Sequence, residues 1–158
     1  MAQEAQVRAT LNIRSGALNY TSNPTAYTAN LPNGVNPAKG PTPGAITVTN
    51  VGVNVSLAQL VQPGLCFIQN LSTEINNGAT DKTGVVEYGI WDPSVARFHP
   101  LGELLPGEFH VIRLSRHLTQ EYGTGPGTGT VPGVHTNALR IRSMTPVAEL
   151  VRVDAFES

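Results

Sequence analysis

Histidine and carboxylate side chains gather near the middle of the sequence, where they could bind a metal ion. They are His99, Glu103, Glu108 and His110, and imidazole with carboxylate suits first-row transition metals. Barrels of the cupin type bind a metal in this way, but their motif needs a His-x-His pair and a further Glu and His at defined spacing, which the chain lacks. Exposed polar residues beside a turn account better for the pattern. We therefore predict no metal site and keep a cupin-like metalloprotein as an alternative.

The sequence offers little for other kinds of catalysis. Cys66 lies in the apolar run 64–68, where a buried and unreactive thiol is expected. No Gly-x-Ser-x-Gly motif occurs to present a nucleophilic serine. The glycine-rich stretch 123–133 lacks the Gly-Lys-Ser/Thr of a phosphate-binding loop. The sequence thus predicts a non-enzymatic protein with no catalytic residue and no cofactor.

Aromatic side chains could instead stack on sugars. The candidates are Tyr20, Tyr27, Tyr88, Trp91 and Tyr122, yet aromatic residues make up only 6% of the chain. Trp91 ends an apolar run, where a tryptophan more often belongs to the core. Glycan binding therefore stays an alternative.

Composition limits the partners. The chain has 158 residues and a formal net charge of −1, so it carries no basic footprint for nucleic acid. Only 13% of residues are charged, and Lys39 and Lys82 are the only lysines. A surface poor in lysine favours contact with other proteins, although a genomic bias toward arginine codons would give the same pattern. No apolar run approaches the roughly 20 residues that cross a bilayer and no signal peptide is visible, so folding in a cytosol without membrane contact is expected.

The hydrophobic pattern predicts strands almost throughout. Residues 5–14 alternate, with Val7 and Ile13 on one face and Arg8 and Arg14 on the other, which is the period of a half-buried strand; residues 17–20 could pair with it. Similar patterns give about eight strands: 5–14, 45–49, 51–55, 65–70, 85–91, 109–114, 138–143 and 148–156. This count predicts an all-β, antiparallel β-sandwich with long loops, for which a jelly roll is the favoured arrangement.

Two turns mark the central stretch. Asp92-Pro93-Ser94 ends one strand, and Leu105-Pro106-Gly107-Glu108 has the proline and glycine of a type II turn. We expect a compact apolar connection between them, with Phe98, Leu101, Leu104 and Leu105 over one end of the core. Residues 72–83 are expected to form a polar hairpin loop. In the last two strands, Leu139 and Ile141 are expected to face inward, as are Leu150 and either Val151 or Val153.

The whole chain, 1–158, is expected to form a single domain with two special segments. Residues 21–44 hold several prolines and few apolar anchors, so they form either an ordered surface loop or an extended arm that packs on a neighbouring subunit; the arm is favoured because proline lowers its cost of ordering. Residues 123–133 are expected to be a mobile glycine-rich loop.

The central run also carries a resemblance. Gly-Ile-Trp-Asp-Pro at 89–93, followed by Pro-Leu-Gly-Glu-Leu-Leu-Pro-Gly-Glu at 100–108, resembles a group of small β-sandwich virion proteins of tailed bacteriophages over roughly residues 60–158. The resemblance implies a capsid decoration or cement protein that binds the major capsid protein or other virion subunits. It also implies a homo-oligomer, with a trimer favoured, located in the virion after assembly in the host cytoplasm. A tail or neck component that binds glycans is the alternative within this group.

Contact residues follow from the exposed segments. We expect Arg8 and Arg14, on the polar face of the first strand, and Tyr27 and Leu31, in the 21–44 segment, to anchor the interface with neighbouring subunits.

Overall fold

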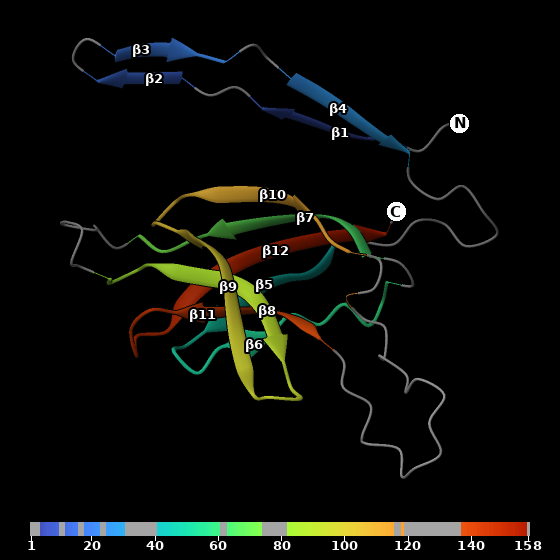
Figure 1. Cartoon of the computed structure of the whole chain (residues 1–158), viewed down its shortest axis with the longest axis vertical. Helices are drawn as coiled ribbons and strands as arrows, with labels where there is room; N and C mark the ends of the chain where they lie inside the picture. Colours follow the sequence, from blue (N-terminus) through green and yellow to red (C-terminus); the bar gives the residue numbers. More distant parts are fainter. Residues whose placement is uncertain are drawn as a thin grey trace. The chain divides into compact units, whose positions relative to one another are not determined.

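The structure is a computed structural model, and it describes residues 4–9, 12–15, 18–22, 25–30, 41–60, 63–73, 82–115, 118 and 137–157. The chain divides into two compact units, residues 1–38 and residues 39–157 (Figure 1). Every regular element in the described ranges is a β-strand. Within those ranges, no helix is long and apolar enough to cross a membrane. The predicted glycine-rich loop at 123–133 lies outside the described residues.

The first unit is a two-stranded ribbon made of two consecutive antiparallel pairs. β1 (Glu4–Ala9) pairs with β4 (Thr25–Asn30), and β2 (Asn12–Ser15) pairs with β3 (Leu18–Thr21). The two pairs follow one another along the ribbon in Figure 1.

Two predictions for this region are corrected in part. The strand expected at 5–14 is described as two strands, β1 and β2, while the expected short partner strand is present as β3. The stretch 21–44, expected to be a loop or arm, contains β4 because Thr25–Asn30 pairs along its whole length with β1. The prolines elsewhere in 21–44 favoured the prediction of a loop, but the six residues of β4 itself contain no proline.

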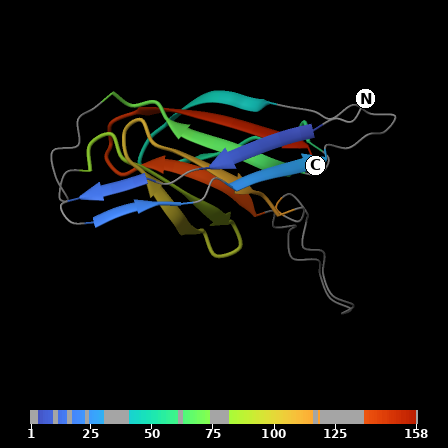
Figure 2. The same cartoon turned by 90° about the horizontal axis from the view of Figure 1, so that it is seen from above.

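The second unit contains two four-stranded antiparallel sheets. The first has the order β10-β7-β12-β5 and the second β6-β11-β8-β9 (Figures 1 and 2). The strands are β5 (Thr42–Val48), β6 (Val53–Asn54), β7 (Pro63–Asn70), β8 (Val86–Asp92), β9 (Arg97–Leu104), β10 (Phe109–Arg113), β11 (Ala138–Ser143) and β12 (Glu149–Glu157). The prediction of an all-β antiparallel sandwich is confirmed.

Strand pairing in this unit is nested. The first strand, β5, pairs with the last, β12; β6 pairs with β11, β7 with β10, and β8 with β9. The β7–β12 and β8–β11 pairings then join these four ribbons into two sheets. Most contacts that define the fold therefore link residues far apart in sequence.

The core lies between the two sheets. Val48, Ile68 and Val151 come from the first sheet, and Val86 and Ile141 from the second; each is fully buried. Burial of such a side chain contributes about 1.5–3 kcal/mol. The predicted inward positions Leu139 and Ile141 are thus confirmed, as alternation along β11 requires.

The central connection is a strand rather than a compact apolar cover. β9 pairs along β8 from Val86–Leu104 to Asp92–Arg97, with a bulge near Tyr88 and Gly89. Of the four apolar residues expected over the core, Leu104 is buried and Phe98 half-buried, but Leu101 and Leu105 are 63% and 40% exposed. Strand pairing turns only one face of β9 inward, so its apolar residues cannot all cover the core.

One further expectation lies mostly outside the described residues, and another is wrong. Of the hairpin loop expected at 72–83, residues 74–81 are not described; the strands that flank the segment, β7 and β8, belong to different sheets. Leu150 is 46% exposed, whereas Val151 and Val153 are fully buried. Adjacent residues of β12 point to opposite faces, so the buried valines force Leu150 outward.

The two predicted turns are confirmed. Gly107 has φ +81°, and the Glu108 N–H donates to the Leu105 carbonyl at 3.0 Å, which closes the turn. Positive φ at the second corner is the type II geometry, which only glycine adopts without strain. In the other turn, the Ser94 N–H donates to Asp92 Oδ1 at 2.8 Å.

Asn70 joins the two sheets at one end of the sandwich. Its side-chain amide is fully buried, and Nδ2 donates to the carbonyls of Gly84 at 2.6 Å and Leu104 at 3.0 Å. Oδ1 accepts from the Ser72 N–H at 3.0 Å. The backbone of Asn70 also bonds Gly107 and Glu108 in the turn before β10. One residue at the end of β7 therefore fixes the ends of β8, β9 and β10.

We predict that Asn70→Asp lowers the free energy of unfolding by about 3 kcal/mol or more, because a carboxylate oxygen would face two carbonyl oxygens that lose their donor. The matched control is Asn54→Asp on the exposed part of β6, where a change within about 0.5 kcal/mol is expected. Urea unfolding measures both. Equal losses in the two variants would contradict a special role for Asn70.

Cys66 belongs to the buried strand β7, as predicted. Its side chain is fully buried in the core. Burial, with a smaller contribution from the negative charge of Asp154, raises the pKa of the Cys66 thiol from 9.0 to about 12. The thiolate, which is the nucleophilic form, is thus absent from the folded protein near neutral pH.

We predict that Cys66 does not react with thiol reagents at pH 8 in the folded protein and reacts fully in urea.

The raised pKa of Cys66 also has a consequence for stability. Above about pH 9 the unfolded thiol loses its proton while the folded thiol keeps it up to about pH 12, so stability falls by up to about 1.4 kcal/mol per pH unit in this window. Cys66→Ala should flatten that slope. An unchanged slope would show that other groups cause it.

Candidate functional site

A cavity of about 400 Å³ is lined by residues of both sheets, from β8, β9 and β11 of one sheet and from β10 of the other. Aliphatic side chains form most of its wall, and four residues add polar atoms. The lining residues are Tyr88, Ile90, Leu101, His110, Ile112, Arg113, Leu114, Ser115, Leu118 and Leu139. Concave, mostly apolar sites with a few polar groups are the usual form of small-molecule pockets.

Tyr88 and His110 bridge the two sheets in the wall of this cavity. Tyr88 on β8 is buried, and its hydroxyl is hydrogen-bonded to Nδ1 of His110 on β10. The rings meet edge to face, with centroids 5.5 Å apart. Gly102 makes room for this arrangement, since a Cβ there would lie 2.5 Å from the Tyr88 hydroxyl oxygen. The tyrosine is thus held by β9 on one side and by β10 on the other.

The polar lining residues differ in charge: Arg113 is cationic, whereas the Tyr88 hydroxyl is neutral. Burial raises the pKa of Tyr88 above its ordinary value of 10.0, so its hydroxyl remains protonated at neutral pH. Arg113 and Ser115 are exposed, and each takes part in an interaction of its own. The Tyr88–His110 pair is the polar contact in the cavity wall that joins the two sheets.

The four residues considered as candidate metal ligands do not form one cluster. His99, Glu103, Glu108 and His110 all lie in described ranges, and within those ranges no group of three or more His, Cys, Asp or Glu side chains could hold a metal. His99 and Glu103 belong to β9, in one sheet, whereas His110 belongs to β10, in the other. These four residues are near one another in sequence but do not form one site.

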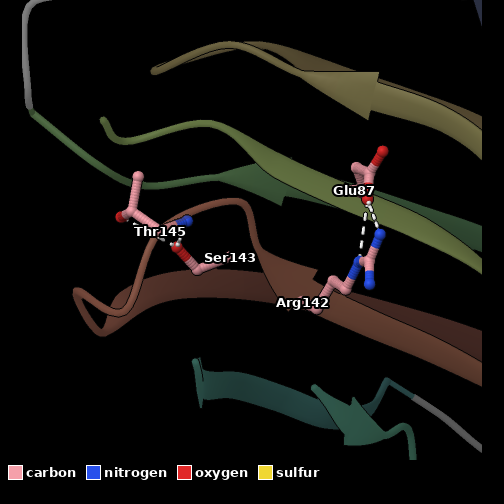
Figure 3. A network of polar contacts seen from close by, with 4 residues as sticks. All are labelled: Glu87, Arg142, Ser143 and Thr145. Atoms are coloured by element: carbon pink, nitrogen blue, oxygen red, sulfur yellow. Dashed lines mark hydrogen bonds and ion pairs between the residues drawn. The ribbon is translucent and has the colours of Figure 1, made fainter. Parts of the chain in front are cut away.

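The outer face of the second sheet carries arginines stacked on aromatic rings. The Arg140 guanidinium lies 3.9 Å from the centre of the Trp91 ring. Arg142 bonds the Glu87 carboxylate through Nε at 2.8 Å and Nη2 at 2.7 Å (Figure 3), and it also lies 4.7 Å from the Phe98 ring centre. Such contacts hold long cationic side chains flat on the sheet.

The position of Trp91 differs from the core position that was expected for it. It is half-buried on the outer face, and Arg140 covers one face of its indole. The alternation in 138–143 contains the signal for this arrangement, because Leu139 and Ile141 face inward and Arg140 must then face outward. Which aromatic ring lies beneath it depends on the β8–β11 register.

Four residues were predicted as interface anchors, and three lie in the described ribbon. Arg8 and Arg14 are exposed on β1 and β2. Tyr27 lies on β4, opposite Val7 in the register of β1 and β4. Leu31 lies outside the described residues. The ribbon therefore unites Arg8, Arg14 and Tyr27 in one element, although they come from two separate stretches of sequence.

Comparison of the chain with protein-family models, with curated protein sequences and with solved structures finds no match.

We predict that Gly102→Ala lowers stability by about 1–3 kcal/mol, because the added methyl group displaces the Tyr88 ring from its place over β9. The His110 side-chain NMR signals should shift as the Tyr88–His110 bond is broken. Glu103→Ala, at the neighbouring exposed position of β9, is the control and should leave both properties unchanged. An unaltered His110 signal in Gly102→Ala would contradict the arrangement.

Proposed function

We propose that this chain is a structural virion protein of a tailed phage that reinforces the capsid by binding neighbouring subunits as a decoration or cement protein. The ribbon of residues 4–30 carries the proposal. It supplies the contact to the major capsid protein or another virion subunit, and the sandwich of residues 39–157 supplies a rigid body. The assembly would be a closed homo-oligomer, with a trimer favoured.

The ribbon supports this function because it has the properties of an arm. A two-stranded ribbon is at best marginally stable alone in water. Among the described residues, those of the hydrophobic core all fall between Val48 and Ala155, and so in the second unit. The register places Val7 opposite Tyr27 and Ala5 opposite Ala29, so apolar residue types coincide across the two strands. A ribbon of this kind gains stability by packing on another protein surface.

The polar positions of the ribbon fit the same function. Arg8 lies opposite Ala26 and Arg14 opposite Asn19, and both arginines are exposed. Neither has an opposite charge as its direct cross-strand neighbour. A guanidinium in such a position can bind a carboxylate of another subunit through two hydrogen bonds.

The winding of the second unit gives further support. We infer a jelly roll from the nested pairing of first strand with last, second with seventh, third with sixth and fourth with fifth. Jelly rolls occur in viral capsid proteins, in lectin domains and in cupins. The turn motif at 100–108, which carries the resemblance to phage virion proteins, closes here through the Leu105–Glu108 hydrogen bond.

We predict that a variant without residues 1–38 folds but no longer co-sediments with virions. Folding should survive because the described core lies entirely within residues 39–157.

Quantitative mass spectrometry of purified particles, with the major capsid protein as the reference, measures the copy number of the full chain. The full chain should be present in tens to hundreds of copies, as expected of a protein that repeats with the symmetry of the head.

A double variant, Arg8→Glu with Arg14→Glu, should weaken association with the particle. The control is Arg97→Glu on the exposed start of β9, which should co-sediment as the full chain does. Retention of the 39–158 variant on particles would refute the ribbon as the contact. A copy number of about three to a dozen would assign the chain to the tail or neck. Absence of the full chain from virions would refute the virion function itself.

A further inference from the structure

All residues that line the cavity belong to the sandwich, whereas the proposed assembly function rests on the ribbon, and the chemistry of the cavity points to a ligand of its own. We propose that it binds a compact, largely aliphatic molecule that carries one neutral hydrogen-bonding group, such as a hydroxyl or a carbonyl. The site belongs to the sandwich alone, so it does not depend on the proposed virion function.

The size and walls of the cavity define the apolar part of the ligand. A volume of about 400 Å³ corresponds to roughly a dozen water-sized volumes, since a water occupies about 30 Å³ in the liquid. Ile90 and Leu139 line it from the second sheet, and Ile112 from the first. Transfer of an aliphatic chain from water to this surface is favourable for each methylene group buried.

The Tyr88–His110 pair defines the polar end. Two hydrogen-bonding groups from opposite sheets meet in the cavity wall, and a phenol oxygen that already makes one such bond can still make a second. The group that binds there should be neutral. The phenol is uncharged at neutral pH, and burial raises its pKa further. Arg113, the one lining residue with a permanent charge, is exposed and already takes part in an interaction of its own. Removing a carboxylate from water beside the phenol would therefore be costly.

Leu101 provides a way to test the site without disturbing the core. Its side chain lines the cavity yet is 63% exposed, so a substitution there removes an apolar wall rather than a buried contact. Leu105, four residues later, is 40% exposed and does not line the cavity. The pair Leu101→Glu and Leu105→Glu thus makes the same chemical change inside and outside the site.

The experiment is a titration of the isotopically labelled full chain with 1-octanol, followed by amide NMR shifts. Saturable shifts confined to the residues around Tyr88, Ile90 and Ile112 are expected. Leu101→Glu should weaken binding about ten-fold by placing a charge at the apolar rim, and Leu105→Glu should bind as the unchanged chain does. Tyr88→Phe should weaken binding about five-fold through loss of one hydrogen bond.

Three results would overturn the proposal. Shifts that grow linearly and spread over exposed apolar residues such as Val51 and Phe109 would show non-specific partition. Equal affinity of Leu101→Glu and Leu105→Glu would place the ligand elsewhere. Tighter binding of octanoate than of octanol would exclude a neutral polar end. If Tyr88→Phe does not fold, the two leucine variants and the octanoate comparison decide the question.

Discussion

The amide side chain of Asn70 couples the two sheets of the sandwich through hydrogen bonds. It connects β7, in one sheet, with Gly84 before β8 and Leu104 at the end of β9, in the other. In a buried amide, hydrogen bonds to both donors and to the acceptor offset the loss of hydration, and they restrict the arrangement of its partners. Apolar packing alone would tolerate sliding of one sheet over the other. The Asn70 bonds remove that freedom at one end.

The cavity lies among elements that this constraint positions. Asn70 fixes the end of β9 and the turn before β10, and these two strands are edge strands of separate sheets. Tyr88 and His110 then span the gap, and the space that they do not fill is the cavity. The same arrangement requires glycine at position 102, because the side chain of any larger residue would occupy the place of the Tyr88 hydroxyl.

The ribbon and the sandwich solve the problem of exposed strand edges differently. In the sandwich, β5, β6, β9 and β10 are the edge strands of their sheets; β6 has only two residues, and β9 carries Pro100 and a bulge. Short, proline-containing and bulged edges resist pairing with other chains. The ribbon differs, because each of its described pairs has only two strands and every one of these strands is an edge.

Local pattern by itself determined the strand type, the turns and several core positions. The strand at 138–143 and the type II turn at 105–108 depend on period-two alternation and on the φ preferences of proline and glycine, which act over a few residues. Only the tertiary structure decided that Arg97–Leu104 is a strand, that Asn70 joins the sheets and that Tyr88 meets His110. These features arise from pairing between residues distant in sequence. Alternation fixes which face a side chain takes, but only register and sheet packing fix its neighbour.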